Sequence, residues 1–366
     1  MRIFTLWLSC DVQMRIAFVS FETVHHRETE TNERLQTVLE LLRDRGHDVH
    51  LFCARWWDGE HPTFEQDDVT YHGVADGLDT PRAFLSRLPF AIRSVSPDLI
   101  HASATPPGQV LASGVGSTLA RAPLLAEWYG EADVVEGRIN RWATGRPDRI
   151  VVPSRLVGTW VQELGANGTR VDVVPNPIDM DLIESIDPGD PFDVVYARRL
   201  DSGANLESLL LALAELRRRE WTATVIGDGP ERSAYEVMAR DLRIDDKITF
   251  AGEISLEERI AHYRGAHVFA QTATRCVFPT ELLWALASGC VGIVEYHANS
   301  SAHELVEGHG RGFRTTSEEE LTSAIIDASS LERMDYDEEF ASFDRESILE
   351  RYLADYRDLQ QKYGVL

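Results

Sequence analysis

Hydrophobic runs of strand length alternate with stretches of helical periodicity from Met14 to about residue 154. A helix is predicted over residues 32–45, since its apolar side chains repeat every three or four positions and Gly46 follows as a cap. This alternation is typical of parallel strands joined by crossover helices and predicts a doubly wound α/β domain. A region punctuated by Pro and Gly follows DVHLFC and extends to about Pro97. The predicted strands are RIAFVS (15–20), DVHLFC (48–53), PDLIHA (97–102), APLLAE (122–127) and DRIVVPS (148–154).

The same alternation restarts after the segment VDVVPNPID and predicts a second Rossmann-like domain. Its predicted strands are FDVVYA (192–197), TATVIG (222–227), KITFAG (247–252) and AHVFA (266–270), with a helix over about residues 205–219. Capping boxes, in which two side chains satisfy free N–H groups reciprocally, are predicted at two helix starts. They are Ser255 with Glu258 and Ser317 with Glu320.

The two predicted domains cover residues 14–180 and 181–343, with no long linker between them. We expect them to face each other across a cleft, because open α/β sheets bind ligands beyond the carboxyl ends of their strands. Residues 344–363 read as an amphipathic helix that packs back on the N-terminal domain. Residues 1–13 lack a signal-peptide pattern, so they either precede the natural start at Met14 or form a disordered tail.

The charge balance narrows the choice of partners. The formal net charge is −24, and the only lysines are Lys247 and Lys362. Such a chain repels phosphate backbones, which argues against nucleic acid. Carboxylate-rich surfaces are also typical of salt-accumulating microbes, so we expect a halophilic cytoplasmic protein. No run reaches about 18 apolar residues, and molar salt would screen repulsion from an anionic membrane. A lipid-linked acceptor at the inner face of the membrane therefore stays open.

The four cysteines do not form a recognisable framework. They show no CxxC spacing and no companion histidine cluster, so neither a structural metal nor disulfides are expected. Cys53 and Cys290 stand in apolar runs and are predicted to be small buried hydrophobes. The remaining two are Cys10 and Cys276.

A series of short motifs between residues 150 and 313 resembles the family 4 glycosyltransferases of GT-B fold in both order and spacing. The motifs are IVVPSRL, VVPNPID, ARRL, VIGDGPER, ITFAGEIS, AHVFA, ALASG and HELVEGHGRGF. The resemblance implies a GT-B fold of two Rossmann-like domains and a UDP-, GDP- or dTDP-sugar donor held by the second. It also implies a glycan, glycolipid or glycoprotein-precursor acceptor met by the first, transfer with retained anomeric configuration, and no metal or other cofactor.

The resemblance also assigns candidate site residues. Arg199 of ARRL takes the place of the family arginine that reaches the donor diphosphate, and its fork suits phosphate oxygens. It could equally be a surface arginine. Glycines after a strand permit close approach of a nucleotide to a helix N-terminus, although a tight turn without ligand would need them too. The further donor-binding candidates are Gly227, Asp228, Gly229, Thr280 and Glu304, and Pro175, Asn176 and Pro177 read as a rigid hinge.

Several family positions are occupied by other residues in this chain. The two glutamates of the family's E-x7-E pattern fall at Cys276 and Trp284, and the family lysine falls at Ala204. A pyrophosphate leaving group needs positive charge where its negative charge develops, and one donor is worth about 3 kcal/mol. With Pro279 predicted at the first helical position, the next N–H groups would offer a positive helix end. Glu281 is a candidate for the ribose contact, or alternatively for offsetting the helix dipole.

The first loop, ETVHHRETETNERL, replaces the family's glycine-rich segment, and Tyr129 stands where the family has a histidine. Within this loop His25 and His26 are the titratable pair, so either is a candidate general base, or both are ordinary surface residues. Two functions follow. The chain is either an active sugar transferase with altered donor chemistry, or a silent GT-B protein that binds sugar nucleotides or partners an active transferase. A sugar epimerase is a more distant alternative.

Overall fold

The computed structural model describes residues 13–59, 61–130 and 137–364. The interpretation of the first thirteen residues, and that of Cys10, therefore falls outside the described part except for Gln13. The chain divides into two compact units, which are described separately. The N-terminal unit takes in Met1–Val151, Val161–Asp172 and Arg351–Leu366, and the C-terminal unit takes in Val152–Trp160 and Val173–Glu350.

The N-terminal unit is built on one largely parallel sheet of order β3-β4-β2-β1-β5-β6-β7-β8. The strand β3 runs antiparallel to its neighbour, β4. Apart from the exposed Arg15, the residues of three central strands are buried, as expected where helices cover both faces. The strands are β1 Arg15–Val19, β2 Asp48–Ala54, β3 Thr63–Gln66, β4 Val69–Ala75, β5 Leu99–Ser103, β6 Leu124–Glu127, β7 Arg149–Val152 and β8 Val171–Val173.

The helices of this unit are α1 Glu30–Asp44, α2 Pro81–Val95, α3 Pro107–Ala120, α4 Arg138–Thr144 and the end of α13 Arg345–Tyr363, with α5 Arg155–Glu163 shared between units. Each predicted strand of this half and the predicted helix at 32–45 is found, within a few residues. The Pro- and Gly-punctuated stretch before Pro97, for which no element was named, holds β3, β4 and α2. Pro89 lies inside α2, and an internal proline normally marks a helix break.

A buried polar network ties α13 to the sheet of the N-terminal unit. The Arg34 side chain on α1 forms an ion pair with Glu127 at the end of β6, and both side chains are at most 5% exposed. Tyr352 donates to the same carboxylate at 2.7 Å and accepts from Arg34 at 2.6 Å. His101 lies 3.0 Å from the other Glu127 oxygen and 2.7 Å from the Tyr356 hydroxyl. Two tyrosines of the terminal helix are thus anchored in the N-terminal unit.

The C-terminal unit has a parallel sheet of order β11-β10-β9-β12-β14-β16. The strands are β9 Phe192–Ala197, β10 Ala223–Ile226, β11 Ile248–Gly252, β12 Ala266–Gln271, β14 Val291–Glu295 and β16 Gly312–Thr315, with a small pair of β13 Arg275–Cys276 and β15 Asn299–Ser300. The helices are α6 Met180–Ser185, α7 Leu206–Glu215, α8 Arg232–Asp241, α9 Leu256–Gly265, α10 Thr280–Ala287, α11 His303–Val306 and α12 Glu318–Ala328. The doubly wound α/β fold is therefore confirmed in both units.

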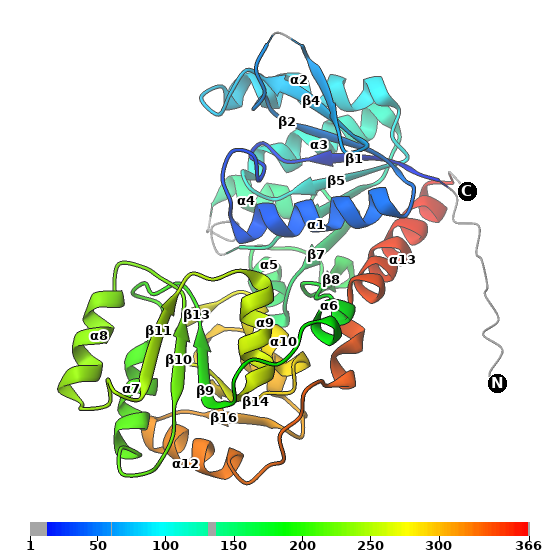
Figure 1. The fold of residues 1–366 in the computed structure, drawn as a ribbon. Helices are drawn as coiled ribbons and strands as arrows, with labels where there is room; N and C mark the ends of the chain where they lie inside the picture. The colour runs from blue at the N-terminus through cyan, green and yellow to red at the C-terminus, as the bar shows by residue number, and fades with distance from the viewer. Residues whose placement is uncertain (1–12, 60, 131–136, 365–366) are drawn as a thin grey trace, which may run out of the picture. The chain divides into compact units, whose positions relative to one another are not determined.

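Helices lie on both sides of this second sheet (Figure 1), and alternating strand residues pack against the helices of each side. Val194 and Tyr196 pack with α7, α8 and α12 in one cluster, whereas Val195 and Ala197 pack with α9 and α10 in another. The capping box of Ser255 is confirmed.

The second predicted capping box is not reciprocal. Ser317 accepts from the Glu320 N–H, but the Glu320 carboxylate accepts from the N–H and hydroxyl of Thr316 instead. The carboxylate therefore reaches one residue earlier than a capping box requires.

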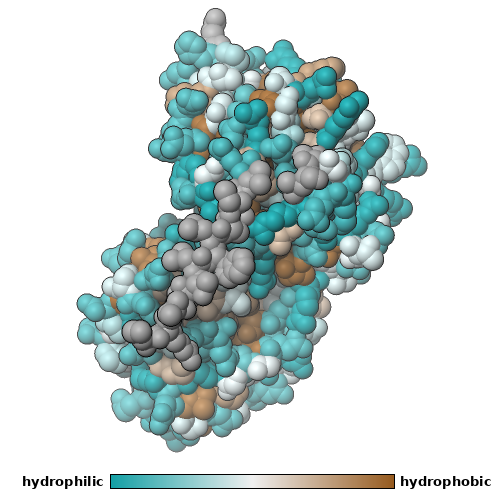
Figure 2. All heavy atoms as spheres, turned by 90° about the vertical axis from the view of Figure 1, so that its right-hand side faces the viewer, coloured by the Kyte–Doolittle hydropathy of each residue, from teal (hydrophilic) through white to brown (hydrophobic). Residues whose placement is uncertain are grey.

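The surface is predominantly polar on the face seen in Figure 2, with hydrophobic side chains in small scattered groups. Within the described ranges, no helix is long and apolar enough to cross a membrane. Cys53 and Cys290 are buried free thiols, as predicted.

Candidate functional site

The topology of the C-terminal sheet points to one edge as the ligand site. From β9 the chain proceeds to β10 and β11 on one side, whereas from β12 it proceeds to β14 and β16 on the other. The carboxyl ends of β9 and β12 are therefore a topological switch point, where open α/β sheets bind ligands in the crevice between diverging loops. The loops that leave this point are residues 198–205 and 272–279.

These two loops are held together by reciprocal hydrogen bonds. The Asn205 side chain donates to the Thr272 carbonyl at 2.9 Å, and the Thr272 hydroxyl donates to the Asn205 carbonyl at 2.7 Å. The Thr274 N–H donates to the Gly203 carbonyl at 3.1 Å. Asn205 adopts a left-handed conformation with φ of 51°, which asparagine tolerates better than most residues. The rim of the crevice is thus fixed by the chain itself.

Two consecutive arginines lie at the start of the first loop. Arg199 is exposed, and Arg198 is half-buried. One Arg198 amino group donates to the Arg275 carbonyl at 2.9 Å, while its buried Nε has no hydrogen-bond partner among the described residues. Over the same part of the chain neither Arg198 nor Arg199 forms an ion pair within 4 Å. Among the described residues the switch point therefore presents two guanidinium groups without a close ion pair, although the Asp228 carboxylate lies near enough for the Arg199 charge to lower its pKa.

Sequence reasoning found Arg199 but missed Arg198. The signal that could have found it is the doubled arginine directly after a buried strand, since both residues of such a pair leave the sheet at its carboxyl edge. The other Arg198 amino group lies 3.6 Å from the point where a side chain on Gly203 would begin. Arg198 therefore spans the space between the two loops.

The glycines of VIGDGPER are explained by chain packing. A Cβ on Gly227 would overlap the Arg198 carbonyl, one on Gly229 would overlap the Leu200 carbonyl, and Gly227 has φ of +118°. Asp228 accepts from the Gly229 N–H at 2.6 Å and from Arg232 at 3.1 Å. That hydrogen bond from the backbone, with the nearby arginines, lowers the pKa of Asp228. The loop packs against the arginine segment. The Gly229 N–H already donates to the Asp228 carboxylate.

The start of α10 differs from the expectation. Pro279 is the N-cap residue and not the first helical residue, because its ψ of 72° is outside the helical range. The Thr280 N–H donates to the Phe278 carbonyl at 3.1 Å, so it is not free for an anion. The Thr280 hydroxyl accepts from the buried Asn176 side chain at 2.8 Å. The segment of Pro175, Asn176 and Pro177, predicted to be a hinge, is thereby fastened to α10 within the C-terminal unit.

The Glu281 carboxylate is bound to α9. One of its oxygens accepts from Arg259 and the other from the Tyr263 hydroxyl. Burial and the adjacent carboxylate raise the pKa of Tyr263 well above its usual value. Both oxygens of Glu281 therefore have protein partners on α9.

Glu304 caps the N-terminus of α5. Its two oxygens accept from the N–H groups of Arg155 and Leu156, each at 2.9 Å. A carboxylate in this position stabilises a helix start by satisfying its free donors. The predicted donor-binding set therefore does not converge on one point. The structure brings Arg199 together with the glycine loop, whereas Glu281 and Glu304 are bound to other helices.

The N-terminal unit carries an aromatic group at the carboxyl edge of its sheet. The His25 ring stacks on Trp56 with centroids 3.9 Å apart, and Tyr71 and Phe64 pack edge-on or tilted around it. Burial lowers the pKa of both His25 and His26, so both are neutral near pH 7. Neutral imidazoles beside aromatic faces can contact a sugar or accept a proton.

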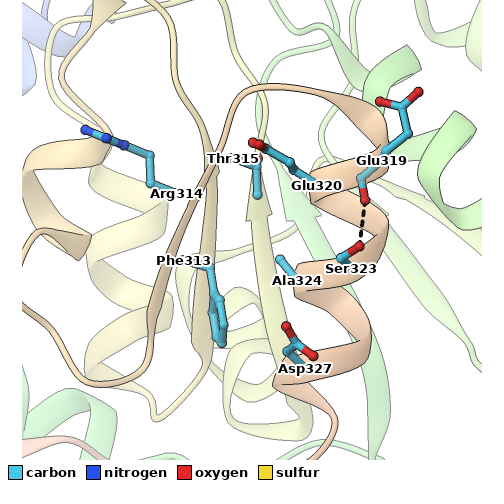
Figure 3. Close-up of a pocket in the computed structure, with 8 residues that line it drawn as sticks. All are labelled: Phe313, Arg314, Thr315, Glu319, Glu320, Ser323, Ala324 and Asp327. Atoms are coloured by element: carbon cyan, nitrogen blue, oxygen red, sulfur yellow. Dashed lines mark hydrogen bonds between the residues drawn. The ribbon is translucent and has the colours of Figure 1, made fainter.

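A separate hollow of 360 Å³ lies between β16 and α12. Figure 3 shows Arg314 pointing away from the helix, while Glu319 and Asp327 belong to the α12 wall. Glu320 on the same wall is already bonded to Thr316. An acidic wall beside the edge strand disfavours a diphosphate, so this hollow is not the candidate donor site.

Two family models match consecutive parts of the chain. One described as Glycosyltransferase Family 4 matches residues 32–182, and one described as Glycosyl transferases group 1 matches residues 182–345. In this order they run through both units. The chain belongs to the family 4 glycosyltransferases of GT-B fold.

Curated relatives resemble part of this glycosyltransferase. Alpha-monoglucosyldiacylglycerol synthase of Streptococcus pneumoniae is 28% identical over 132 residues, which is 36% of this chain and 30% of that protein. A GDP-mannose-dependent alpha-(1-6)-phosphatidylinositol monomannoside mannosyltransferase of Mycolicibacterium smegmatis is 30% identical over 147 residues, which is 39% and 37% of the two chains. The chain thus spans about a third of the length of the curated relatives it matches.

Solved structures share the whole fold of this glycosyltransferase. A glycosyltransferase from Rickettsia africae has a TM-score of 0.75 at 14% identity, covering 95% of this chain and 98% of that one. Anabaena Alr3699/HepE, solved with UDP and glucose, has a TM-score of 0.64 at 17% identity, covering 96% and 98%. At these identities the likeness establishes the fold.

Several positions of this glycosyltransferase carry residues that differ from the family pattern, and most of these residues are buried. Trp284 is 6% exposed and Ala204 fully buried, and Tyr129 is 1% exposed. The Ala204 carbonyl accepts from the Tyr196 hydroxyl at 2.7 Å. Cys276 is half-exposed on β13. At Trp284 and Ala204, buried hydrophobic side chains therefore occupy positions where the family has charged ones.

Proposed function

We propose that this glycosyltransferase moves a sugar from a nucleotide-sugar donor to a glycolipid or another glycan precursor. By family resemblance the transfer retains the anomeric configuration and uses no metal. The observation that carries the proposal is the pair Arg198 and Arg199 at the switch point of the C-terminal sheet. Neither guanidinium group forms an ion pair within 4 Å among the described residues, which leaves both able to bind a diphosphate.

The step that most needs stabilisation is the departure of the nucleoside diphosphate. As the bond between the anomeric carbon and the phosphate oxygen breaks, negative charge grows on the departing nucleoside diphosphate. Fixed donors aimed at that oxygen stabilise the transition state more than the ground state. Arg199 is exposed and able to swing onto the diphosphate, while Arg198 is fixed by its bond to the Arg275 carbonyl.

Arg198 compensates for the missing family lysine in this proposal. The lysine position is Ala204, which is buried and cannot carry charge. One Arg198 amino group comes within 3.6 Å of where a Gly203 side chain would begin, directly beside that position. The positive charge is therefore supplied from the end of β9 in place of the following turn.

The remaining predicted residues support the site in other ways. Gly227 and Gly229 allow the loop after β10 to press against the arginine segment, and Asp228 holds that loop in shape. The ribose role for Glu281 is not part of the proposal, because both of its oxygens are bonded to α9. Glu304 is proposed to act on α5 and not on the donor.

The acceptor and donor classes are suggested by the relatives. Two of them are named for glycolipids, a monoglucosyldiacylglycerol and a phosphatidylinositol monomannoside. One relative is named for GDP-mannose, and one structural neighbour was solved with UDP. We therefore favour a membrane glycolipid acceptor and a UDP- or GDP-sugar. The aromatic group of His25, Trp56 and Tyr71 is the proposed acceptor surface, since aromatic faces pack on sugar rings.

An assay of donor hydrolysis and sugar transfer over UDP-, GDP- and dTDP-sugars tests the proposal. Molar KCl is included because the acidic composition indicates a halophilic cytosol. Turnover that falls about 100-fold or more in Arg199→Ala and Arg198→Ala would support it, since that is the effect of losing one charge-stabilising donor. Arg218→Ala, an exposed arginine outside the crevice, is the matched control. Nucleotide binding without turnover by any donor would favour the silent partner subunit instead.

A further inference from the structure

The most exposed large hydrophobic side chains of the described residues gather on three successive helices of the N-terminal unit. Phe90 on α2 is 69% exposed, and Trp142 on α4 is 65% exposed. Ile139 on α4 and Val115 on α3 follow at 54% and 52%, ahead of every other residue of this class. Soluble proteins rarely expose such residues together unless the patch has a partner.

These three helices cover the same face of the sheet. The connections β4-α2-β5, β5-α3-β6 and β6-α4-β7 all run in one direction across the strand order. Right-handed crossovers then place α2, α3 and α4 on one face, and α1, whose connection runs the other way, on the opposite face.

Direct packing agrees with this arrangement. A Cβ on Gly116 of α3 would come within 2.9 Å of Ile92 on α2, and one on Gly114 would lie 3.7 Å from Arg146 beside α4. The exposed apolar side chains are therefore carried by helices of one outer layer. We call this layer the α2–α4 face, defined by Phe90, Val115, Ile139 and Trp142.

The charge of the α2–α4 face is opposite to that of the whole protein. The three helices contain no aspartate or glutamate, in a chain whose net charge is −24. None of their arginines forms an ion pair with a carboxylate in the described part of the chain. Long arginine side chains around aromatic and aliphatic residues are suited to an interface between water and lipid. The arginines of these helices are Arg82, Arg87, Arg93, Arg138 and Arg141.

We propose that the α2–α4 face docks on the surface of an anionic lipid bilayer. The apolar side chains enter the boundary between head groups and acyl chains, and the arginines contact lipid phosphates. At low salt, where charges are not screened, the acidic remainder of the protein is repelled by the same surface, which orients the docked unit. A second copy is a poorer occupant, because a symmetric contact would set these arginines against one another. The inference deepens the proposed function by assigning the surface that brings the enzyme to a lipid acceptor.

Vesicle flotation tests the proposal with the whole protein and no nucleotide. The wild type is expected to float with phosphatidylglycerol vesicles and much less with phosphatidylcholine vesicles at low salt. Phe90→Ser with Trp142→Ser should raise the half-saturating lipid concentration about tenfold or more, as expected for removing two inserted apolar side chains. Val237→Ser on α8, a residue 47% exposed, is the matched control and should bind like the wild type.

A second variant separates charge from insertion. Arg138→Gln with Arg141→Gln should weaken flotation at low salt, with Arg240→Gln of α8 as its control. In molar KCl this charge variant should match the wild type, because screening removes the electrostatic part, whereas the Phe90/Trp142 variant should stay weak.

Three results would overturn the proposal. They are a wild type that floats with neither lipid, face variants that float as well as the wild type, and face variants that change only the oligomeric state. The last would make the surface a contact between protein chains. Flotation does not depend on turnover, so loss of binding with normal transfer to a soluble acceptor refutes the docking surface alone. Face-dependent flotation by a protein that transfers no sugar refutes the proposed function alone.

Discussion

Replacing Glu127 by glutamine should destabilise the N-terminal unit far more than a single neutralised charge at the surface would. In the wild type this carboxylate is enclosed by Arg34, His101 and Tyr352, and its side chain is 5% exposed. Glutamine preserves the shape and can still accept hydrogen bonds, but it leaves the Arg34 guanidinium, 2% exposed, without a counter-charge. Removing one partner of a buried ion pair costs about 3–5 kcal/mol.

The expected loss can be measured by thermal melting and by hydrogen exchange of α13. For a unit of this size the cost corresponds to a fall of roughly 6–20 °C in melting temperature. The amides of the second half of α13 should exchange faster, because Tyr352 loses its charged acceptor. Asp48→Asn is the control, since its ion pair with Arg15 is 34% and 46% exposed and such pairs are worth about 1 kcal/mol or less. Equal effects of the two substitutions would refute the account of the network.

Glu127 should also make the stability of the N-terminal unit depend on pH. Burial by itself would raise the pKa of Glu127, but the Arg34 charge and the His101 hydrogen bond outweigh it and hold that pKa below the usual value. A lowered pKa in the folded state means that the stabilisation is complete above the unfolded value of about 4.3 and is lost as pH falls below it. The difference between wild type and Glu127→Gln should therefore shrink below about pH 4. A difference that stays constant down to pH 3 would contradict this.

Two further substitutions test the crevice. Glu281→Gln should lower the melting temperature while leaving nucleotide affinity unchanged in calorimetry, since its carboxylate is bonded to α9; a tenfold weaker affinity would restore the ribose role. Gly227→Ala should reduce both stability and nucleotide affinity, because the new Cβ would displace the Arg198 carbonyl. Gly308→Ala, which also has positive φ but open space around it, is the control, and equal effects of the two would contradict the packing argument.

Much of the fold could be predicted from local pattern, because buried parallel strands are nearly continuous apolar runs. The elements that escaped prediction have weaker local signals. Within α2, the internal Pro89 reads in the sequence as a helix break. In β4, His72 and Gly73 interrupt the run of apolar residues that indicates a strand. Tertiary packing decides such segments, and packing is not visible in a short window of sequence.

For the site, the sequence predicts which residues stand at motif positions but not which contacts their side chains make. Arg199 follows from its place after a strand, but the contacts of Glu281 and Glu304 do not. Each of these carboxylates is engaged by helices distant in sequence, at Arg259 and at Arg155. Arg198 was missed because its position between the two loops depends on the fold of the crevice.

A crystal structure of the protein soaked with UDP or GDP tests the central claim most directly. The account predicts the diphosphate at the carboxyl ends of β9 and β12, with oxygens about 2.7–2.9 Å from the guanidinium groups of both Arg198 and Arg199. A nucleotide bound elsewhere, or a diphosphate in the crevice with Arg199 turned away into solvent, would contradict it.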